Sequence, residues 1–291
     1  MSSSVRKLER GEVQIDGEID AIVFESFRPA AVKNLNDRHT IKGFRPGQAP
    51  EKVLADAMGE ETILNEMAKL AFSQAYPGLL AEHHIDAIGY PLITLTKLAR
   101  GNPLGFSART AVAPVITLGD YAAAARAALA EPVAADSKDD KNDEDKTADK
   151  HRLKIAQKIT NEAKVDLPEV LIAAETNKIL AEFRSSLEQA GLKFSDYLER
   201  IKKTEAELKD EWRPVASERL TMTLALATIA KKENISLPAE KITAEVERIS
   251  VAYPDLDKEK VAAYVSERLM NEAVWLWLEN QGKRSTSTPQ V

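Results

Sequence analysis

The chain has 291 residues, of which 44% are hydrophobic and 30% charged, and its net charge at pH 7 is −6. This balance excludes a disordered chain and predicts a soluble, globular protein long enough for two ordinary domains. The absence of cysteine excludes disulfides, the acidic charge disfavours a general nucleic-acid binder, and no apolar run is as long as the ~20 residues of a membrane span.

The first 120 residues alternate between strand and helix patterns. Polar and apolar side chains alternate over residues 12–19, which is the period of a half-buried strand. Apolar side chains then recur every three or four residues, with Pro29 and Gly59 predicting interruptions. The patterns predict helical segments over residues 20–37 and 50–84 and two antiparallel strands over residues 88–112. We therefore expect an α+β domain over residues 1–120.

One loop between the two helical segments has an unusual composition, Gly43-Phe44-Arg45-Pro46-Gly47-Gln48-Ala49-Pro50. Proline fixes φ and removes a backbone donor, whereas glycine permits conformations closed to other residues. These residues predict a stiff, tightly turned loop with Phe44 and Arg45 at its tip. An aromatic ring beside a guanidinium group suits a partly apolar, partly anionic surface such as that of a ribonucleoprotein.

The loop lies in a stretch with a local excess of positive charge. Between residues 28 and 52 the acidic side chains are Asp37 and Glu51, whereas the basic ones are Arg28, Lys33, Arg38, Lys42, Arg45 and Lys52. This excess would allow a local RNA contact in an otherwise acidic chain. The alternative is a solvated face of helix and loop.

Residues 121–150 change in character from alanine-rich to acidic. The acidic part lacks the glycine that an EF-hand calcium loop needs at its sixth position, so we expect a flexible linker and no metal site. Beyond it, residues 151–281 contain only helical patterns, with a capping box from Thr204 to Glu207 and a bend at Pro214. We expect residues 282–291 to form a disordered tail.

Groups that could catalyse a reaction are scarce. The adjacent pair His83-His84 is poorly suited to share one metal ion, because neighbouring side chains on a helix point about 100° apart. The sequence contains neither a phosphate-binding P-loop pattern nor a Gly-x-Ser-x-Gly nucleophile elbow. We expect no catalytic residues, no cofactor and no enzyme activity.

Two sets of residues resemble the trigger factor family, bacterial chaperones that act at the nascent-chain exit tunnel of the ribosome. The pattern G-F-R-x-G-x-x-P over residues 43–50 resembles the ribosome-docking signature of that family. Later patterns resemble its C-terminal domain in order and spacing: Leu167-Pro168-Glu169, Trp212-x-Pro214-x-Ala216 and Leu226-x-x-Ile229-Ala230. A similar helical arrangement occurs in the exported SurA chaperones. The resemblance implies an α+β ribosome-binding domain followed by an all-α, SurA-like C-terminal domain.

The resemblance also implies partners and site residues for an ATP-independent chaperone. The ribosome-binding residues, which would meet protein and rRNA of the large subunit, are Lys42, Gly43, Phe44, Arg45, Pro46, Gly47 and Pro50. The substrate-binding residues, which would meet nascent or unfolded polypeptides through apolar contacts, are Met222, Leu224, Leu226, Ile229, Trp275 and Trp277. The start of the chain has no apolar core for a secretory signal, so we expect a cytoplasmic protein without membrane or DNA partners.

The chain departs from the family pattern in two ways. Full-length members carry an FKBP-type prolyl-isomerase domain between the two regions, for which residues 122–150 are too few and contain no aromatic side chain. Pro46 and Gln48 stand where many members have lysine, which predicts weaker docking. Two alternatives stay open: a prolyl cis–trans isomerase like the full-length members, and a free cytosolic holdase or assembly factor that does not dock on ribosomes.

Overall fold

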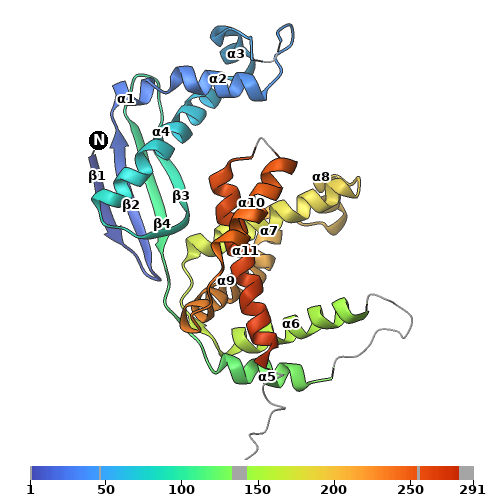
Figure 1. Ribbon diagram of the computed structural model, residues 1–291. Helices are drawn as coiled ribbons and strands as arrows, with labels where there is room; N and C mark the ends of the chain where they lie inside the picture. Colours follow the sequence, from blue (N-terminus) through green and yellow to red (C-terminus); the bar gives the residue numbers. More distant parts are fainter. Residues whose placement is uncertain (1, 46, 133–142, 254–255, 282–291) are drawn as a thin grey trace, which may run out of the picture. The chain divides into compact units, whose positions relative to one another are not determined.

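The computed structural model describes residues 2–45, 47–132, 143–253 and 256–281. The chain forms two compact units, the first from Met1–Pro114 and Leu167–Ala174, and the second from Val115–Asp166 and Glu175–Val291. The first unit is α+β and the second is almost entirely helical, which confirms the predicted fold class (Figure 1). None of the described helices combines the length and the apolar character needed to cross a bilayer.

A four-stranded antiparallel sheet forms one layer of the first unit. Its strands follow the order β1-β2-β4-β3, with bounds β1 (Ser2–Lys7), β2 (Glu12–Ile19), β3 (Ala87–Lys97) and β4 (Leu104–Val112). The alternation over residues 12–19 predicted β2 correctly, because its inward-facing Val13, Ile15 and Ile19 are buried.

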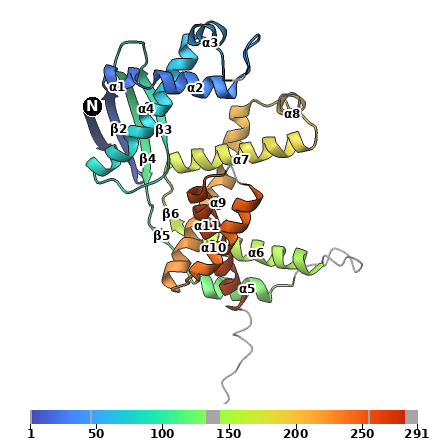
Figure 2. The same ribbon diagram turned by 45° about the horizontal axis from the view of Figure 1, so that its top comes forward.

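Helix α4 (Glu60–Glu82) covers one face of this sheet (Figures 1 and 2). The rings of Phe72 on α4 and Phe106 on β4 meet edge to face, with centroids 5.2 Å apart. One turn further along α4, the Tyr76 hydroxyl donates to the Thr110 hydroxyl of β4 at 2.8 Å. The core of the first unit therefore lies between the sheet and α4, with an aromatic contact at its centre.

Three shorter helices precede α4: α1 (Ala21–Glu25), α2 (Arg28–Arg38) and α3 (Glu51–Met58). Pro29 lies in the first turn of α2, where a missing N–H costs nothing, so the predicted interruption separates α1 from α2. Gly59 separates α3 from α4 and has φ of +85°, a conformation that favours glycine. The interruption predicted at Gly59 therefore lies between α3 and α4.

A short segment from later in the chain completes the first unit. The buried carboxylate of Glu12 accepts a hydrogen bond from the backbone N–H of Val170 at 3.0 Å, and another from the Arg109 guanidinium. Val170 lies in the first turn of α7 (Glu169–Gln189), whose leading N–H groups have no partner within the helix. Glu12 therefore caps α7 with a favourable charge and fixes its first turn to β2.

The second unit is built from the remainder of α7 and six further helices in the described chain. Their bounds are α5 (Tyr121–Ala130), α6 (Asp143–Glu162), α8 (Phe194–Ile201), α9 (Glu205–Lys232), α10 (Ala239–Ala252) and α11 (Lys258–Glu279). The predicted capping box opens α9: the Thr204 hydroxyl accepts from the Glu207 N–H at 3.3 Å, and the Glu207 carboxylate accepts from the Thr204 N–H at 2.8 Å. A two-residue pairing of β5 (Ile116–Thr117) with β6 (Lys164–Val165) joins two connecting segments.

The stretch expected as a linker, residues 121–150, differs from the prediction. Residues 121–130 form α5, whose Ala124, Ala125 and Ala128 are buried in the core of the second unit against α6, α9 and α11. Helix α6 begins at Asp143, eight residues before the expected start of the helical domain. Residues 133–142 and the expected tail, residues 282–291, lie outside the described residues. Alanine favours helix, and its small side chain lets neighbouring helices pack closely, which the composition alone does not reveal.

Candidate docking loop

The glycine- and proline-rich loop joins α2 to α3 in the first unit (Figure 1). Two hydrogen bonds close successive turns within it: Phe44 N–H donates to the carbonyl of Ile41, and Gln48 N–H to the carbonyl of Arg45, both at 3.0 Å. Gly43 and Gly47 have φ of +91° and +78°, in the left-handed region that other residues rarely adopt. The loop is therefore tightly turned, as its composition predicts. Pro46 lies outside the described residues.

The tip of the loop is exposed. Lys42, Gly43, Phe44 and Arg45 are all exposed, as is Pro50 at the end of the loop, whereas Gly47 is half-buried. Phe44 exposes 38% of its surface although its side chain is apolar. An aromatic ring and two cations are thus accessible together on one short segment.

Asn36 fastens the base of the loop. Its buried carboxamide donates from Nδ2 to the carbonyl of Ala49 at 2.6 Å and accepts at Oδ1 from the Ala49 N–H at 3.3 Å. The backbone carbonyl of Asn36 accepts from the Gly47 N–H at 3.1 Å. A side chain at Gly47 would lie 2.9 Å from a carboxylate oxygen of Asp37, so the two ends of the loop also approach closely there. These contacts hold residues 47–49 against the last turns of α2.

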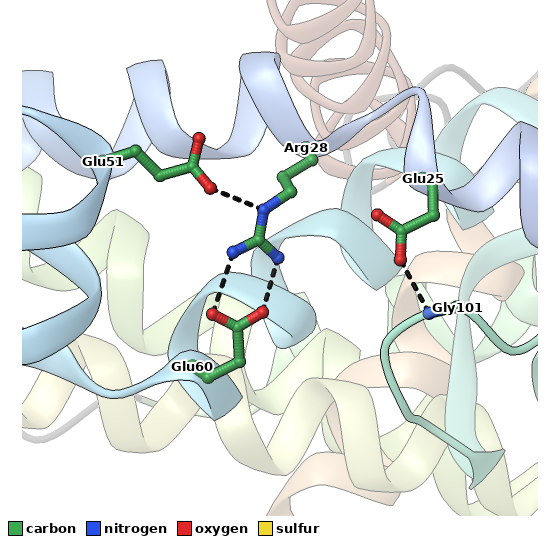
Figure 3. A network of polar contacts seen from close by, with 5 residues as sticks. All are labelled: Glu25, Arg28, Glu51, Glu60 and Gly101. Atoms are coloured by element: carbon green, nitrogen blue, oxygen red, sulfur yellow. Dashed lines mark hydrogen bonds and ion pairs between the residues drawn. The ribbon is translucent and has the colours of Figure 1, made fainter.

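Arg28 fixes the helices on which the loop stands. Its Nε donates to Glu51 of α3 at 2.7 Å, and its terminal nitrogens donate to the Glu60 carboxylate of α4 at 2.5 and 2.8 Å (Figure 3). Only 10% of the Arg28 side chain is exposed. The hydrogen bonds with Arg28 lower the pKa of Glu60 and raise that of Arg28, so both groups stay ionised. Because Glu51 directly follows Pro50, this network fixes the exit of the loop.

A separate contact holds α1. The Glu25 carboxylate accepts a hydrogen bond from the Gly101 N–H in the turn between β3 and β4, at 2.7 Å (Figure 3). This bond joins the helical layer to the sheet beside the Arg28 network.

The local positive charge is smaller than the sequence suggests. Arg28 is committed to two glutamates, and Arg38 lies 3.5 Å from the Glu66 carboxylate. Among the residues that the structure describes, exposed cations without an ion pair in this stretch are Lys33, Lys42, Arg45 and Lys52. Arg28 therefore has a structural role, and only Lys42 and Arg45 supply charge at the tip of the loop.

The residues expected to bind substrate differ in their exposure. Leu226 and Ile229 are buried in the core of the second unit, with 5% and 0% of their surfaces exposed, which removes them from any client-binding surface. Met222 and Leu224 are half-buried, and Met222 packs against the same core. Helix α9 is apolar on several faces because its buried side chains pack in one core with those of α5, α6 and α11.

Trp275 and Trp277 are also half-buried and pack on neighbouring helices. The Arg152 guanidinium lies over the Trp275 ring, 5.8 Å from its centroid. The Trp277 ring lies 5.9 Å from that of Tyr121, whose hydroxyl donates to Glu233 at 2.5 Å. Both tryptophans therefore stabilise α11 against α5 and α6.

Other apolar side chains of the second unit are exposed. Helix α10 has no buried residue, and the segment from α10 into α11 exposes Val251, Tyr253, Leu256 and Tyr264, each by more than half of its surface. An open, mainly apolar cavity of about 620 Å³ lies between the end of α9 and Met270 of α11. In the described part of the chain, no group of three or more histidine and carboxylate side chains is arranged to hold a metal ion.

Comparison with known families decides the identity of the chain. Residues 1–146 match the model of the bacterial trigger factor protein, and residues 136–281 match the model of its C-terminus. The chain belongs to the trigger factor family. The candidate docking loop and the described helices of the second unit of this family member lie within matched residues.

Individual relatives of this trigger factor family member match over different lengths. The trigger factor of Moorella thermoacetica is 35% identical over 121 residues, which are 42% of this chain and 27% of that protein. The trigger factor of Synechococcus sp. is 36% identical over 135 residues, or 44% of this chain and 24% of that protein. The chain thus matches about a quarter of the length of such relatives.

Two comparisons extend over most of the chain. The trigger factor of Agathobacter rectalis is 20% identical over 403 residues, covering 92% of this chain and 91% of that protein. A solved structure described as "Promiscuous Substrate Recognition in Folding and Assembly Activities of the Trigger Factor Chaperone" has a TM-score of 0.46 and 12% identity, covering 97% of this chain and all of that one.

Two residues of this trigger factor family member were not singled out from the sequence. Arg28 looks like one more surface cation, and only the placement of Glu51 and Glu60 around it shows otherwise. Asn36 lies near the end of a helix, and its role depends on a contact with Ala49, thirteen residues later in the chain, which the sequence does not show. A polar residue at an otherwise apolar position of the α2 pattern is the one local signal for Asn36.

Proposed function

We propose that this protein is an ATP-independent chaperone that docks at the ribosomal exit tunnel through residues 42–50 and shields nascent or unfolded polypeptides with its helical unit. The proposed partners are protein and rRNA of the large subunit, in the cytoplasm. The observation that carries the proposal is the exposed pair Phe44 and Arg45 on a loop whose base and exit are hydrogen-bonded. Membership of the trigger factor family supports the same function.

The composition of the loop tip sets the character of the proposed docking contact. Burying the exposed part of the Phe44 ring would contribute about 1 kcal/mol. Lys42 and Arg45 could neutralise two phosphates, and each neutralised phosphate steepens the salt dependence of log K by ~0.7–0.9. We therefore expect a weak contact, for which the slope of log K against log salt concentration is no steeper than about −2.

The exposed side chains of the α10–α11 segment are the proposed client surface. Val251, Tyr253, Leu256 and Tyr264 offer apolar area without a fixed pattern of hydrogen-bonding groups. Apolar contacts are non-directional, so such a surface accepts many sequences. Small, scattered contacts give low affinity and fast release, which a client must have in order to fold.

Prolyl isomerisation is the less favoured alternative. The two matched family regions, residues 1–146 and 136–281, overlap along the chain. The alignment with the Agathobacter rectalis protein is longer than this whole chain, so part of that relative has no counterpart here. We propose that the counterpart of the isomerase domain is among the missing parts. Measurable turnover of a proline tetrapeptide would overturn this proposal.

A free holdase that does not dock on ribosomes is the second alternative. Co-sedimentation with ribosomes tests it, with the wild type compared with the double variant Phe44→Ala, Arg45→Ala. The matched control is Tyr90→Ala, Lys97→Ala, which removes an exposed aromatic and an exposed cation from β3 of the same unit. The proposal expects much less of the loop variant to sediment with ribosomes and the control to sediment like the wild type. A wild type that stays in the supernatant would favour the free holdase. Equal sedimentation of all three with ribosomes would show that the loop is not the docking site.

A further inference from the structure

The way in which the loop is fastened carries an inference that rests on the proposed docking function. We infer that Asn36 is a positioning residue for docking: its buried carboxamide fixes the conformation in which the loop presents Phe44 and Arg45. Asn36 has 6% of its surface exposed, so it cannot itself form much of a contact with a ribosome. Any effect of Asn36 on docking must therefore act through the loop.

The geometry of Asn36 supports this role because three of its polar groups bind the same short segment. Nδ2 donates to the Ala49 carbonyl at 2.6 Å, Oδ1 accepts from the Ala49 N–H at 3.3 Å, and the backbone carbonyl accepts from the Gly47 N–H at 3.1 Å. Ala49 is itself 5% exposed, so these bonds are shielded from water. Shielded hydrogen bonds are costly to leave unmade, which holds the loop closed.

Asparagine is one of the few side chains that satisfy both groups of Ala49. A carboxamide donates and accepts at once, whereas aspartate would only accept and would place a negative charge beside the Ala49 carbonyl. Alanine at position 36 would leave a buried N–H and a buried carbonyl without partners. The loop would then lose both side-chain bonds at its base and keep only the bond from Gly47 N–H to the backbone carbonyl of residue 36.

A closed loop binds more tightly because less conformational entropy is lost on docking. Freeing the base of the loop lets residues 39–48 sample other conformations, and that freedom must be removed again whenever the loop binds. We expect Asn36→Ala to weaken ribosome affinity about tenfold, although the variant still carries the Phe44 and Arg45 side chains.

A matched control separates positioning from simple stabilisation. Asn34 lies two residues earlier on α2, and its Nδ2 donates to Glu66 of α4 at 3.2 Å and not to the loop. Asn34→Ala removes the same carboxamide from the same helix. We expect it to bind ribosomes within about twofold of the wild type.

The experiment is a double-mutant cycle on the full chain. Each variant carries a fluorophore on Leu192→Cys, an exposed position of the second unit in a protein without other cysteines, and is titrated with ribosomes. The variants are Asn36→Ala, Asn34→Ala, the pair Phe44→Ala with Arg45→Ala, and the triple combination with Asn36→Ala. If Asn36 acts through the tip, Asn36→Ala lowers the ribosome affinity of the wild type. It then has no further effect on the affinity of the Phe44→Ala, Arg45→Ala variant.

Two results would overturn the inference while the docking proposal stands. One is an Asn36→Ala affinity equal to that of Asn34→Ala. The other is an effect of Asn36→Ala on affinity that is as large in the Phe44→Ala, Arg45→Ala variant as in the wild type. A general destabilisation of the protein would give that result. Wild-type affinity of the Phe44→Ala, Arg45→Ala variant would instead overturn docking through the loop, and the inference with it.

Hydrogen exchange on the wild-type chain tests the inference without any variant. The N–H groups of Gly47 and Ala49 are bonded to Asn36, and the structure gives those of Lys42 and Arg45 no backbone partner within the described residues. We expect Gly47 and Ala49 to exchange more slowly than Lys42 and Arg45. Equal, fast exchange at all four positions would show that Asn36 does not hold the loop.

Discussion

The proposed docking loop and the α10–α11 segment both expose apolar side chains, but the two are held in different ways. The loop is short, and buried polar side chains, Asn36 and Arg28, fasten its base and exit. Helix α10 has no buried residue, and its ion pairs among Glu245, Arg248 and Arg268 lie on the surface. Fixed geometry suits one defined partner, whereas a loosely held apolar surface suits many clients. The comparison teaches that burial of the supporting polar groups, more than the exposed residues themselves, distinguishes the two kinds of surface.

The largest expected effect tests where the helical unit derives its stability. Ile229→Ala removes a fully buried side chain from α9 and should destabilise the second unit by about 3 kcal/mol. All three tryptophans, Trp212, Trp275 and Trp277, belong to this unit, so urea unfolding followed by tryptophan fluorescence reports it selectively. A change below about 1 kcal/mol would mean that α9 is less enclosed than the structure indicates.

The next effect compares one arginine from each region. Arg28→Ala breaks three hydrogen bonds of a guanidinium that is 10% exposed and should destabilise the first unit by about 2 kcal/mol. Arg268→Ala removes an ion pair between an exposed arginine and Glu245, and should cost much less than Arg28→Ala. Peptide-resolved hydrogen exchange measures both on the full chain. Equal costs would contradict the distinction between the two regions.

Acid should weaken the support of the loop through the Arg28–Glu60 pair. The hydrogen bonds from Arg28 hold the pKa of Glu60 below its usual value of 4.5. Because the folded pKa is the lower one, the ionised carboxylate stabilises the fold above the unfolded pKa, and this stabilisation is lost as the pH falls through the folded pKa. Exchange protection of residues 51–60 should therefore fall in acid, and Glu60→Gln should flatten this dependence. An unchanged pH profile in Glu60→Gln would rule out the pair as its cause.

The smallest effect on stability is expected for the proposed client surface. Tyr253→Ala and Tyr264→Ala remove rings that are 64% and 62% exposed, so stability should change by no more than about 0.5 kcal/mol. Suppression of aggregation of an unfolded client should nevertheless weaken in the double variant. The matched control is Tyr90→Ala in the first unit, where an 85% exposed ring lies outside the proposed surface. Full suppression by the double variant would place client binding elsewhere.

The sequence predicted those features that depend on neighbouring residues. Alternation located β2, Pro29 and Gly59 located the helix interruptions, and the Thr204–Glu207 pattern located the start of α9. Each of these signals acts within about one turn of helix or one strand, where local physics dominates.

The features that the sequence did not predict depend on residues distant along the chain. Alanines 124, 125 and 128 looked like a linker because nothing near them shows that α6, α9 and α11 enclose them. Leu226 and Ile229 were expected on a client surface but are buried. An apolar pattern on several helix faces fits an exposed surface and a buried helix equally well. Arg28 and Asn36 acquired their roles only when Glu60 and Ala49 came into contact with them.

Site-specific photo-crosslinking tests the central proposal most directly. A photoreactive phenylalanine analogue at position 44, in the exposed tip of the loop, is compared with the same analogue at position 90, which is exposed on β3. The account predicts that position 44 crosslinks to protein or rRNA of the large ribosomal subunit and that position 90 does not. A ribosome complex that forms without a crosslink from position 44, or with equal crosslinks from both positions, would contradict it.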